Sequence, residues 1–188
     1  MELGTIFQSI IGAGIGSALI QGVLPFVRDN RERAARASHM AIRLAVGLEA
    51  YAAACHDLIA YNTNAEVHPE ERLPNWKAQL PELAEFPADT EGWRALDRQL
   101  AGRCLSFRNK VAESQGLINE TIYYNDDNIG DAVEVEATAR GLEAWRLASA
   151  LRRKHKVEAA EPVWDYIEHL ERSEKRIEEA AEKRRSGS

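Results

Sequence analysis

Glu49, His56 and Asp57 come nearest, in type and spacing, to residues that could do chemistry in this chain. Glu49 and His56 are seven residues apart, so they lie on one face of a helix, and Asp57 follows His56 directly. Within a helical bundle, polar pairing explains such a carboxylate and histidine more often than catalysis does. We therefore expect Glu49 and His56 to have a structural role.

No catalytic or cofactor motif is found in the sequence. Glu168 and His169 are adjacent, whereas di-iron helical bundles use a Glu-x-x-His spacing. Gly12, Gly14 and Gly16 imitate a phosphate-binding loop, but no strand precedes them. There is also no His-Glu-x-x-His, Cys-x-x-Cys or nucleophile-elbow pattern. We therefore expect no enzymatic activity, no cofactor and no metal.

The two cysteines, Cys55 and Cys104, stand in separate apolar patterns. We expect both to be buried free thiols, as is usual for a protein of the reducing cytoplasm. A disulfide between them stays open only if the membrane topology predicted below is inverted.

The element that must position everything else is Leu3–Val27, which has 25 residues and no charge in a chain with 29% charged residues. As a helix it would be about 37 Å long, enough to cross a hydrocarbon core of roughly 30 Å. We predict that residues 1–27 form a transmembrane segment and that a cleaved secretory signal is a poor fit.

Small residues form two rows within this segment at four-residue spacing. One row is Gly12 and Gly16, and the other is Gly14, Ala18 and Gly22. Such rows let membrane helices approach closely, and two rows on separate faces suggest two neighbours for each helix. The hypothesis is a homo-oligomer assembled in the lipid bilayer. The alternative is that glycine is simply common in membrane helices.

The charges next to the segment predict its orientation. Arg28, Arg31, Arg33 and Arg36 follow it, whereas no Lys or Arg precedes it. By the positive-inside rule we expect the N-terminus outside and the helical domain in the cytoplasm, at the cell (inner) membrane.

Residues 28–170 are predicted to form a cytoplasmic bundle of about four helices, so the fold class is all-α. The first helix covers 29–61 and is predicted to continue from the membrane helix as one rod. Its apolar or small residues alternate in steps of three and four. They are Ala34, Ala37, Ala41, Leu44, Leu48, Tyr51, Cys55 and Leu58.

A proline-rich strap is predicted at residues 62–88, where four of the six prolines fall. Its apolar residues make it too hydrophobic for a disordered linker, so we expect it to pack across the bundle, with a short helix near Trp76. The alternative is that the strap binds a protein partner, which is not identified. The candidate surface for that partner consists of Trp76, Leu80 and Phe86.

Three further helices are predicted after the strap. One runs from about Thr90 to Tyr124 with a kink or break near Gly102, and one runs over 129–156 after an Asn128 cap. The last starts at Pro162 and ends in a charged helical tail, residues 171–188. The basic end of the 129–156 helix fits the carbonyl end of the helix dipole, with lipid headgroups as the alternative.

Charge and composition narrow the function. Without Glu2 there are 29 acidic and 24 basic residues, which argues against binding nucleic acid. We expect a membrane-tethered, self-associating helical scaffold or interaction protein. One alternative is a pore-forming or other membrane-active component built on the glycine-rich helix. A second is a subunit of a soluble or virion assembly in which that helix is buried.

Overall fold

The computed structural model describes residues 4–65, 75–124, 128–162 and 165–186, with side chains from Val27 onward. In these ranges all regular structure is helical and there is no strand. The helices are α1 (Gly4–Thr63), α2 (Thr90–Ala95), α3 (Arg98–Tyr124), α4 (Ile129–Lys154) and α5 (Tyr166–Ser186). The predicted all-α class and helical bundle are confirmed.

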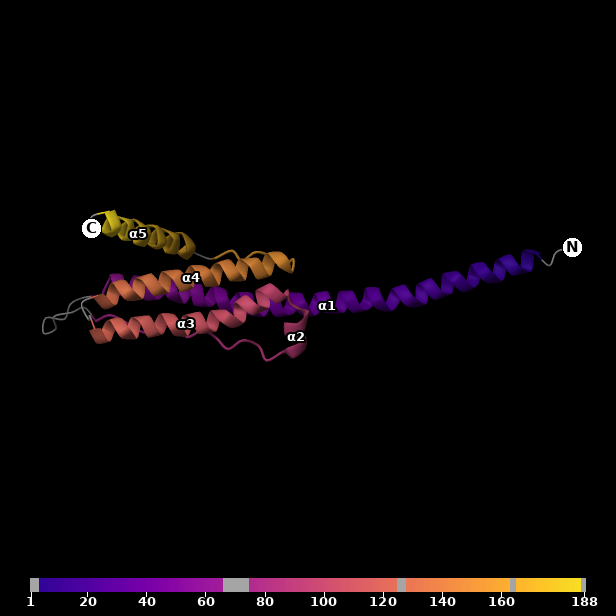
Figure 1. Cartoon of the computed structure of the whole chain (residues 1–188), viewed down its shortest axis with the longest axis horizontal. Coiled ribbons are helices and arrows are strands. Elements are labelled where there is room, and N and C mark those ends of the chain that lie inside the picture. Colours follow the sequence, from indigo (N-terminus) through magenta and orange to yellow (C-terminus); the bar gives the residue numbers. More distant parts are fainter. Residues whose placement is uncertain (1–3, 66–74, 125–127, 163–164, 187–188) are drawn as a thin grey trace.

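The bundle is built around α1 and α4, which pack along each other, with α3 and α5 on α4 (Figure 1). The α1 side of this core follows the predicted seam from Ala37 to Leu58, where all of its residues are buried, whereas Ala34, which was also predicted to belong to it, is exposed. Small residues bring the helices close. A Cβ on Gly141 of α4 would lie 3.0 Å from the Cys55 Cβ and 3.2 Å from Leu170 Cδ1.

The strap, described over residues 75–89, has no regular secondary structure there and lies against α3. Its Leu80 is buried, and the Leu80 N–H donates to Gln115 Oε1 at 2.7 Å, while Gln115 Nε2 donates to the Ala78 carbonyl at 3.1 Å. Hydrogen bonds to a helix side chain replace the backbone partners that an extended segment lacks. The short helix predicted near Trp76 is not found in the described residues of the strap.

The predicted helix from Thr90 is broken at Leu96–Asp97, a few residues before the kink or break predicted near Gly102, and Gly102 itself lies within α3. Leu96 is extended, with ψ 159°, and the Asp97 carboxylate then accepts from the Gln99 and Leu100 N–H groups at 3.0 and 3.1 Å. These bonds cap α3 and lower the pKa of Asp97. The interruption of the helix is thus set by the cap at Asp97 and not by the weak helix propensity of Gly102.

The remaining helix ends differ slightly from the prediction. Asn128 precedes α4 but makes no side-chain capping bond, and α4 ends at Lys154. α5 begins at Tyr166 and not at Pro162, because the Asp165 carboxylate accepts from the Glu168 N–H at 3.0 Å and caps it there. α5 stays helical to Ser186, although its last buried residue is Ser173.

The helix is continuous as predicted, since α1 is one helix from Gly4 to Thr63. The predicted span at residues 1–27 falls almost wholly outside the residues whose side chains are described, as do the two small-residue rows. Across the part of the chain that the structure does describe, none of the helices combines the length and apolar character needed to cross a bilayer. The transmembrane segment and the oligomer therefore receive no support from the structure and stay predictions.

Candidate functional site

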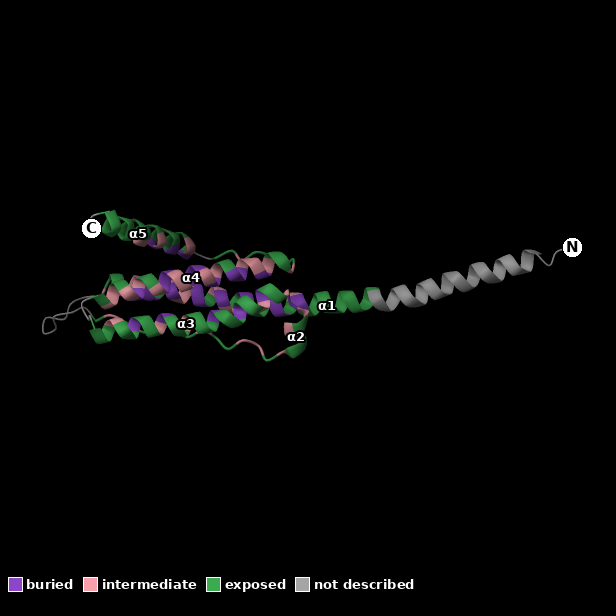
Figure 2. Ribbon diagram, viewed as in Figure 1, coloured by how far each residue is buried: buried purple, intermediate pink, exposed green. Residues whose placement is uncertain are grey.

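The most unusual feature of the molecule is the part of α1 that leaves the bundle, shown on the right of Figure 2. Every side chain from Val27 to Arg36 is exposed, and the first buried residue is Ala37. The helical backbone from Gly4 to Arg36 corresponds to about 50 Å at the rise of an α-helix. We call residues 27–36 the rod; a lone helix of ten residues would be marginal in water.

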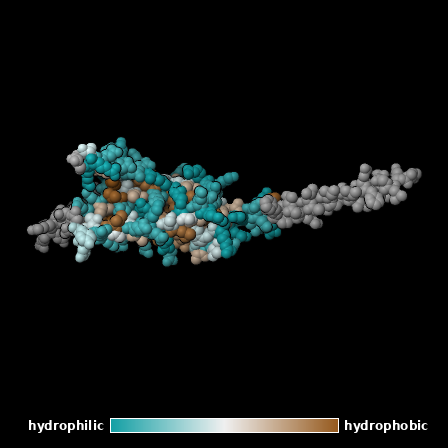
Figure 3. All heavy atoms as spheres, in the orientation of Figure 1, coloured by the Kyte–Doolittle hydropathy of each residue, from teal (hydrophilic) through white to brown (hydrophobic). Residues whose placement is uncertain are grey.

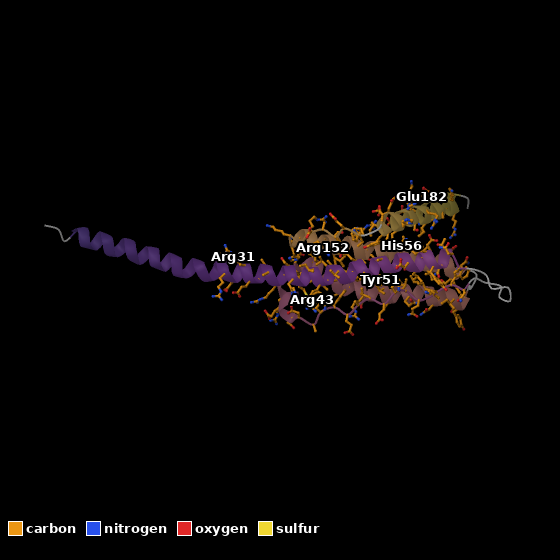
Figure 4. The ribbon with its side chains drawn as sticks, turned by 180° about the vertical axis from the view of Figure 1, so that it is seen from behind. Arg31, Arg43, Tyr51, His56, Arg152 and Glu182 are labelled. Carbon is orange, nitrogen blue, oxygen red and sulfur yellow. The ribbon has the colours of Figure 1, made fainter. Side chains whose placement is uncertain are left out.

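The four predicted membrane-flanking arginines all lie on the rod. Arg28 Nε bonds Glu32 at 2.9 Å, and Arg36 lies 3.4 Å from Glu32 and 3.7 Å from Glu91. The hydrogen bond from Arg28 lowers the pKa of Glu32. Arg31 and Arg33 form no ion pair with any described residue, and Figure 4 shows Arg31 on the free helix. With four arginines against one aspartate and one glutamate, the rod has a net positive charge.

The Glu49 carboxylate pairs with Arg152 of α4 and not with His56. Arg152 Nε and an Arg152 terminal nitrogen donate to its two oxygens at 2.6 and 2.8 Å, and both side chains are only 14% exposed. This bidentate bond raises the pKa of Arg152 and links α1 to the end of α4. The sequence indicated Arg152 only as one of a basic run at a helix end.

His56 instead lies against α5 (Figure 4). Its ring meets the His169 ring edge-on, with centroids 5.3 Å apart, and its Nδ1 is 3.3 Å from Asp57 Oδ1. His56 and His169 line one side of a hollow of about 470 Å³ between α1 and α5. Among the described residues, no group of three or more His, Cys, Asp or Glu is arranged to hold a metal ion.

Three buried polar atoms on α1 and α4 lack a hydrogen-bond partner among the described residues. They are the Tyr51 hydroxyl, the Thr138 hydroxyl and the Arg140 Nε. Burial raises the pKa of Tyr51, so its phenol stays protonated. Arg140 is held by Glu143 at 2.5 Å. Such groups cost free energy unless they are paired, and sequence periodicity gave no sign of them.

The two thiols are buried and free, as predicted. Burial raises the pKa of Cys55 and of Cys104 to about 12. Because the thiolate is the nucleophile, neither cysteine is activated for catalysis or disulfide exchange.

The candidate partner surface on the strap is largely folded onto the bundle. Leu80 is only 5% exposed, and Trp76 and Phe86 are half-buried. Trp76 packs over Gly130 of α4, and the Phe86 ring lies 6.1 Å from that of Trp93. Little of these side chains is left for a partner, and the proposed role stays a prediction.

Comparison with protein-family models, curated proteins and solved structures found no match to this chain. The function therefore has to be inferred from its own geometry. The candidate chemical groups are not activated: Cys55 and Cys104 are buried with raised pKa values, and Glu49 is paired with Arg152. What distinguishes the chain is one helix that is both the core of a bundle and a free rod.

Proposed function

We propose that this protein is a membrane-tethered helical scaffold, in which α1 connects a lipid-embedded N-terminus to a bundle that faces the cytoplasm. The observation that carries this proposal is the continuity of α1 from Gly4 to Thr63. Because the same helix supplies the bundle core and the projecting rod, the bundle is held in a fixed direction relative to whatever binds the N-terminus. A flexible linker would not fix that direction.

Two features support lipid as the binding medium. The stretch Leu3–Val27 has no charge, whereas the next ten residues include four arginines. A basic segment directly after an apolar helix suits the headgroup region of the cytoplasmic leaflet. Each cation there contributes about 1 kcal/mol to membrane binding. The rod is exposed on all sides, so headgroups can reach its arginines.

Membrane extraction tests the tether. We expect the full chain to stay with membranes after washing with carbonate, and a double variant, Ile11→Lys with Ile15→Lys, to be released. Each lysine at the centre of a membrane helix costs about 3 kcal/mol. The matched control, Ala35→Lys with His39→Lys, adds the same two charges at the same spacing to an exposed part of α1 and should be retained.

Release of the unmodified chain by carbonate would contradict the tether and favour burial of the helix in a soluble assembly. Leakage of a trapped dye from liposomes that carry the chain would instead replace the scaffold with a pore.

Self-association is the second part of the proposal. Gly14→Leu and Gly16→Leu fill the two small-residue rows, and we expect each to lower the oligomeric mass measured by light scattering in detergent. Ala13→Leu adds similar bulk outside both rows and should leave the mass unchanged. An equal mass for all four proteins would remove the oligomer and leave the tether standing.

A further inference from the structure

One end of the bundle lies opposite the N-terminus (Figure 1). It carries a large share of the exposed apolar side chains. This tip is formed by the C-terminal end of α3, the N-terminal end of α4 and the C-terminal half of α5. Tyr123 and Tyr124 are 80% and 76% exposed, Leu117 is 53% exposed, and Ile122 and Val135 are each 39% exposed. The two tyrosines alone present roughly 300 Å². A patch of this size on a soluble domain usually has a function.

The tip is hollowed and not flat. A depression of about 710 Å³ lies between α3 and α4, with Leu117, Tyr124 and Val135 in its lining. A second, of about 390 Å³, lies between α4 and α5 and includes Ile177 and Ala180. The two share Asp131, Val135 and Arg184, so they form one groove, which we call the tip groove. Figure 3 shows hydrophobic atoms at this end beneath the hydrophilic ridge of α5.

The tip is also the acidic pole of the molecule. Residues 111–139 contain seven Asp or Glu and no Lys or Arg, whereas the whole chain has 30 acidic and 24 basic residues. The rest of the chain is therefore close to neutral, with a net charge of +1. All of the excess negative charge lies in the α3–α4 hairpin.

The groove keeps this character despite two arginines from α5. Arg176 is paired with Glu134, and Arg184 reaches both depressions. Glu120, Asp131 and Glu136 also line the groove, and none of them has an ion-pair partner in the described part of the chain. An apolar floor with a carboxylate rim complements a partner that has apolar side chains flanked by cations.

We propose that the tip groove binds an amphipathic helix of another protein, with apolar residues on one face and Lys or Arg beside them. Grooves between helices commonly bind such a helix through its apolar face. An anionic lipid surface is a poor occupant, because the rim carboxylates would repel it. The inference goes beyond the tether, because every residue given above as lining the groove lies between Leu117 and Arg184, outside α1.

The probe for this proposal is a fluorescent 15-residue peptide of Leu and Lys with apolar residues at helical spacing. A second peptide has the same composition in alternating order, which is not amphipathic as a helix. The full chain is embedded in phosphatidylcholine nanodiscs, and empty discs give the lipid background. We expect saturable binding of the first peptide, and at least tenfold weaker binding of the second, by fluorescence anisotropy.

Two substitutions separate docking from simple charge attraction. Leu117→Glu and Val135→Glu make the tip more acidic but remove apolar contacts, so docking predicts at least tenfold weaker binding and charge attraction predicts tighter binding. Leu105→Glu is the matched control, because Leu105 is 56% exposed on α3 away from the tip. It should change the affinity less than twofold. Tyr124→Ser removes apolar area without adding charge and should also weaken binding.

Tighter or unchanged binding by Val135→Glu, or equal binding of both peptides, would overturn the proposal. So would self-association of the chain that Leu117→Glu and Tyr124→Ser abolish, because the occupant would then be a second copy. Membrane retention after a carbonate wash should be the same for all these variants. Failure of the groove and failure of the tether are therefore distinguishable.

Discussion

The two parts of α1 that flank Ala37 share one helix but have opposite surroundings. From Ala37 to Ile59 an apolar stripe is buried against the other helices, whereas from Val27 to Arg36 every side chain is exposed. Helix stability in proteins comes mainly from burying an apolar face. The bundle part buries its stripe mainly against α4, whereas the rod buries no side chain against the described residues. The same change of side chain should therefore have different effects in the two parts.

The largest expected contrast between the two parts is thiol reactivity. Cys55 has a pKa raised by burial to about 12, whereas a cysteine on the rod, Ala35→Cys, should have an ordinary pKa of about 8.5. At pH 8 the fraction of thiolate then differs roughly a thousandfold. Labelling followed by mass spectrometry should modify residue 35 within minutes and leave Cys55 intact. Fast labelling of Cys55 in the folded protein would contradict the burial of the α1–α4 seam.

Truncating a side chain should lower the free energy of unfolding in the bundle part of α1 and not in the rod. Leu48 is fully buried, so Leu48→Ala should lower the free energy of unfolding by about 3 kcal/mol. Val27→Ala, on the exposed rod, should change it by less than about 0.5 kcal/mol. Thermal or denaturant unfolding in detergent measures both. A comparable loss from Val27→Ala would show that the rod packs on something within the chain.

Removing an ion pair should also have different effects on the free energy of unfolding in the two parts of α1. Glu49→Gln leaves Arg152, which is 14% exposed, without its carboxylate and should cost about 2 kcal/mol. On the rod, Glu32→Gln removes contacts to Arg28 and Arg36 that water replaces, and no change in unfolding is expected. Equal effects of the two substitutions would mean that the Glu49–Arg152 pair is no better shielded from solvent than the rod.

The smallest expected effect concerns the buried Tyr51 hydroxyl in the bundle part of α1. Tyr51→Phe removes a buried hydroxyl that has no partner among the described residues, and we expect a gain in stability of about 1 kcal/mol. Tyr51 also stacks edge-on with Phe107, with ring centroids 5.6 Å apart, and phenylalanine keeps that contact. A loss of stability would show that the hydroxyl is paired in the core, by the neighbouring Cys55 thiol or by an internal water molecule.

Local patterns predicted the helices well and their mutual contacts poorly. The three-and-four spacing of apolar residues gave the buried stripe of α1, and the same helix was expected to continue from Leu3–Val27. The break was expected near Gly102 and lies at Leu96–Asp97, because capping by a single carboxylate, and not the glycine, decides where the helix is interrupted. A structural role was expected for Glu49, but its partner Arg152 could not be predicted, because it is 103 residues away in sequence.

The sequence by itself determined which segments are helical and which face of each is apolar, because these depend on neighbours within a few turns. It also determined that charge is absent from residues 3–27. Only the tertiary structure decided that α1 leaves the bundle at Ala37, and that the acidic and apolar residues of α3, α4 and α5 meet in one groove. Both depend on which helices pack together, and helix packing joins residues that are distant in the chain.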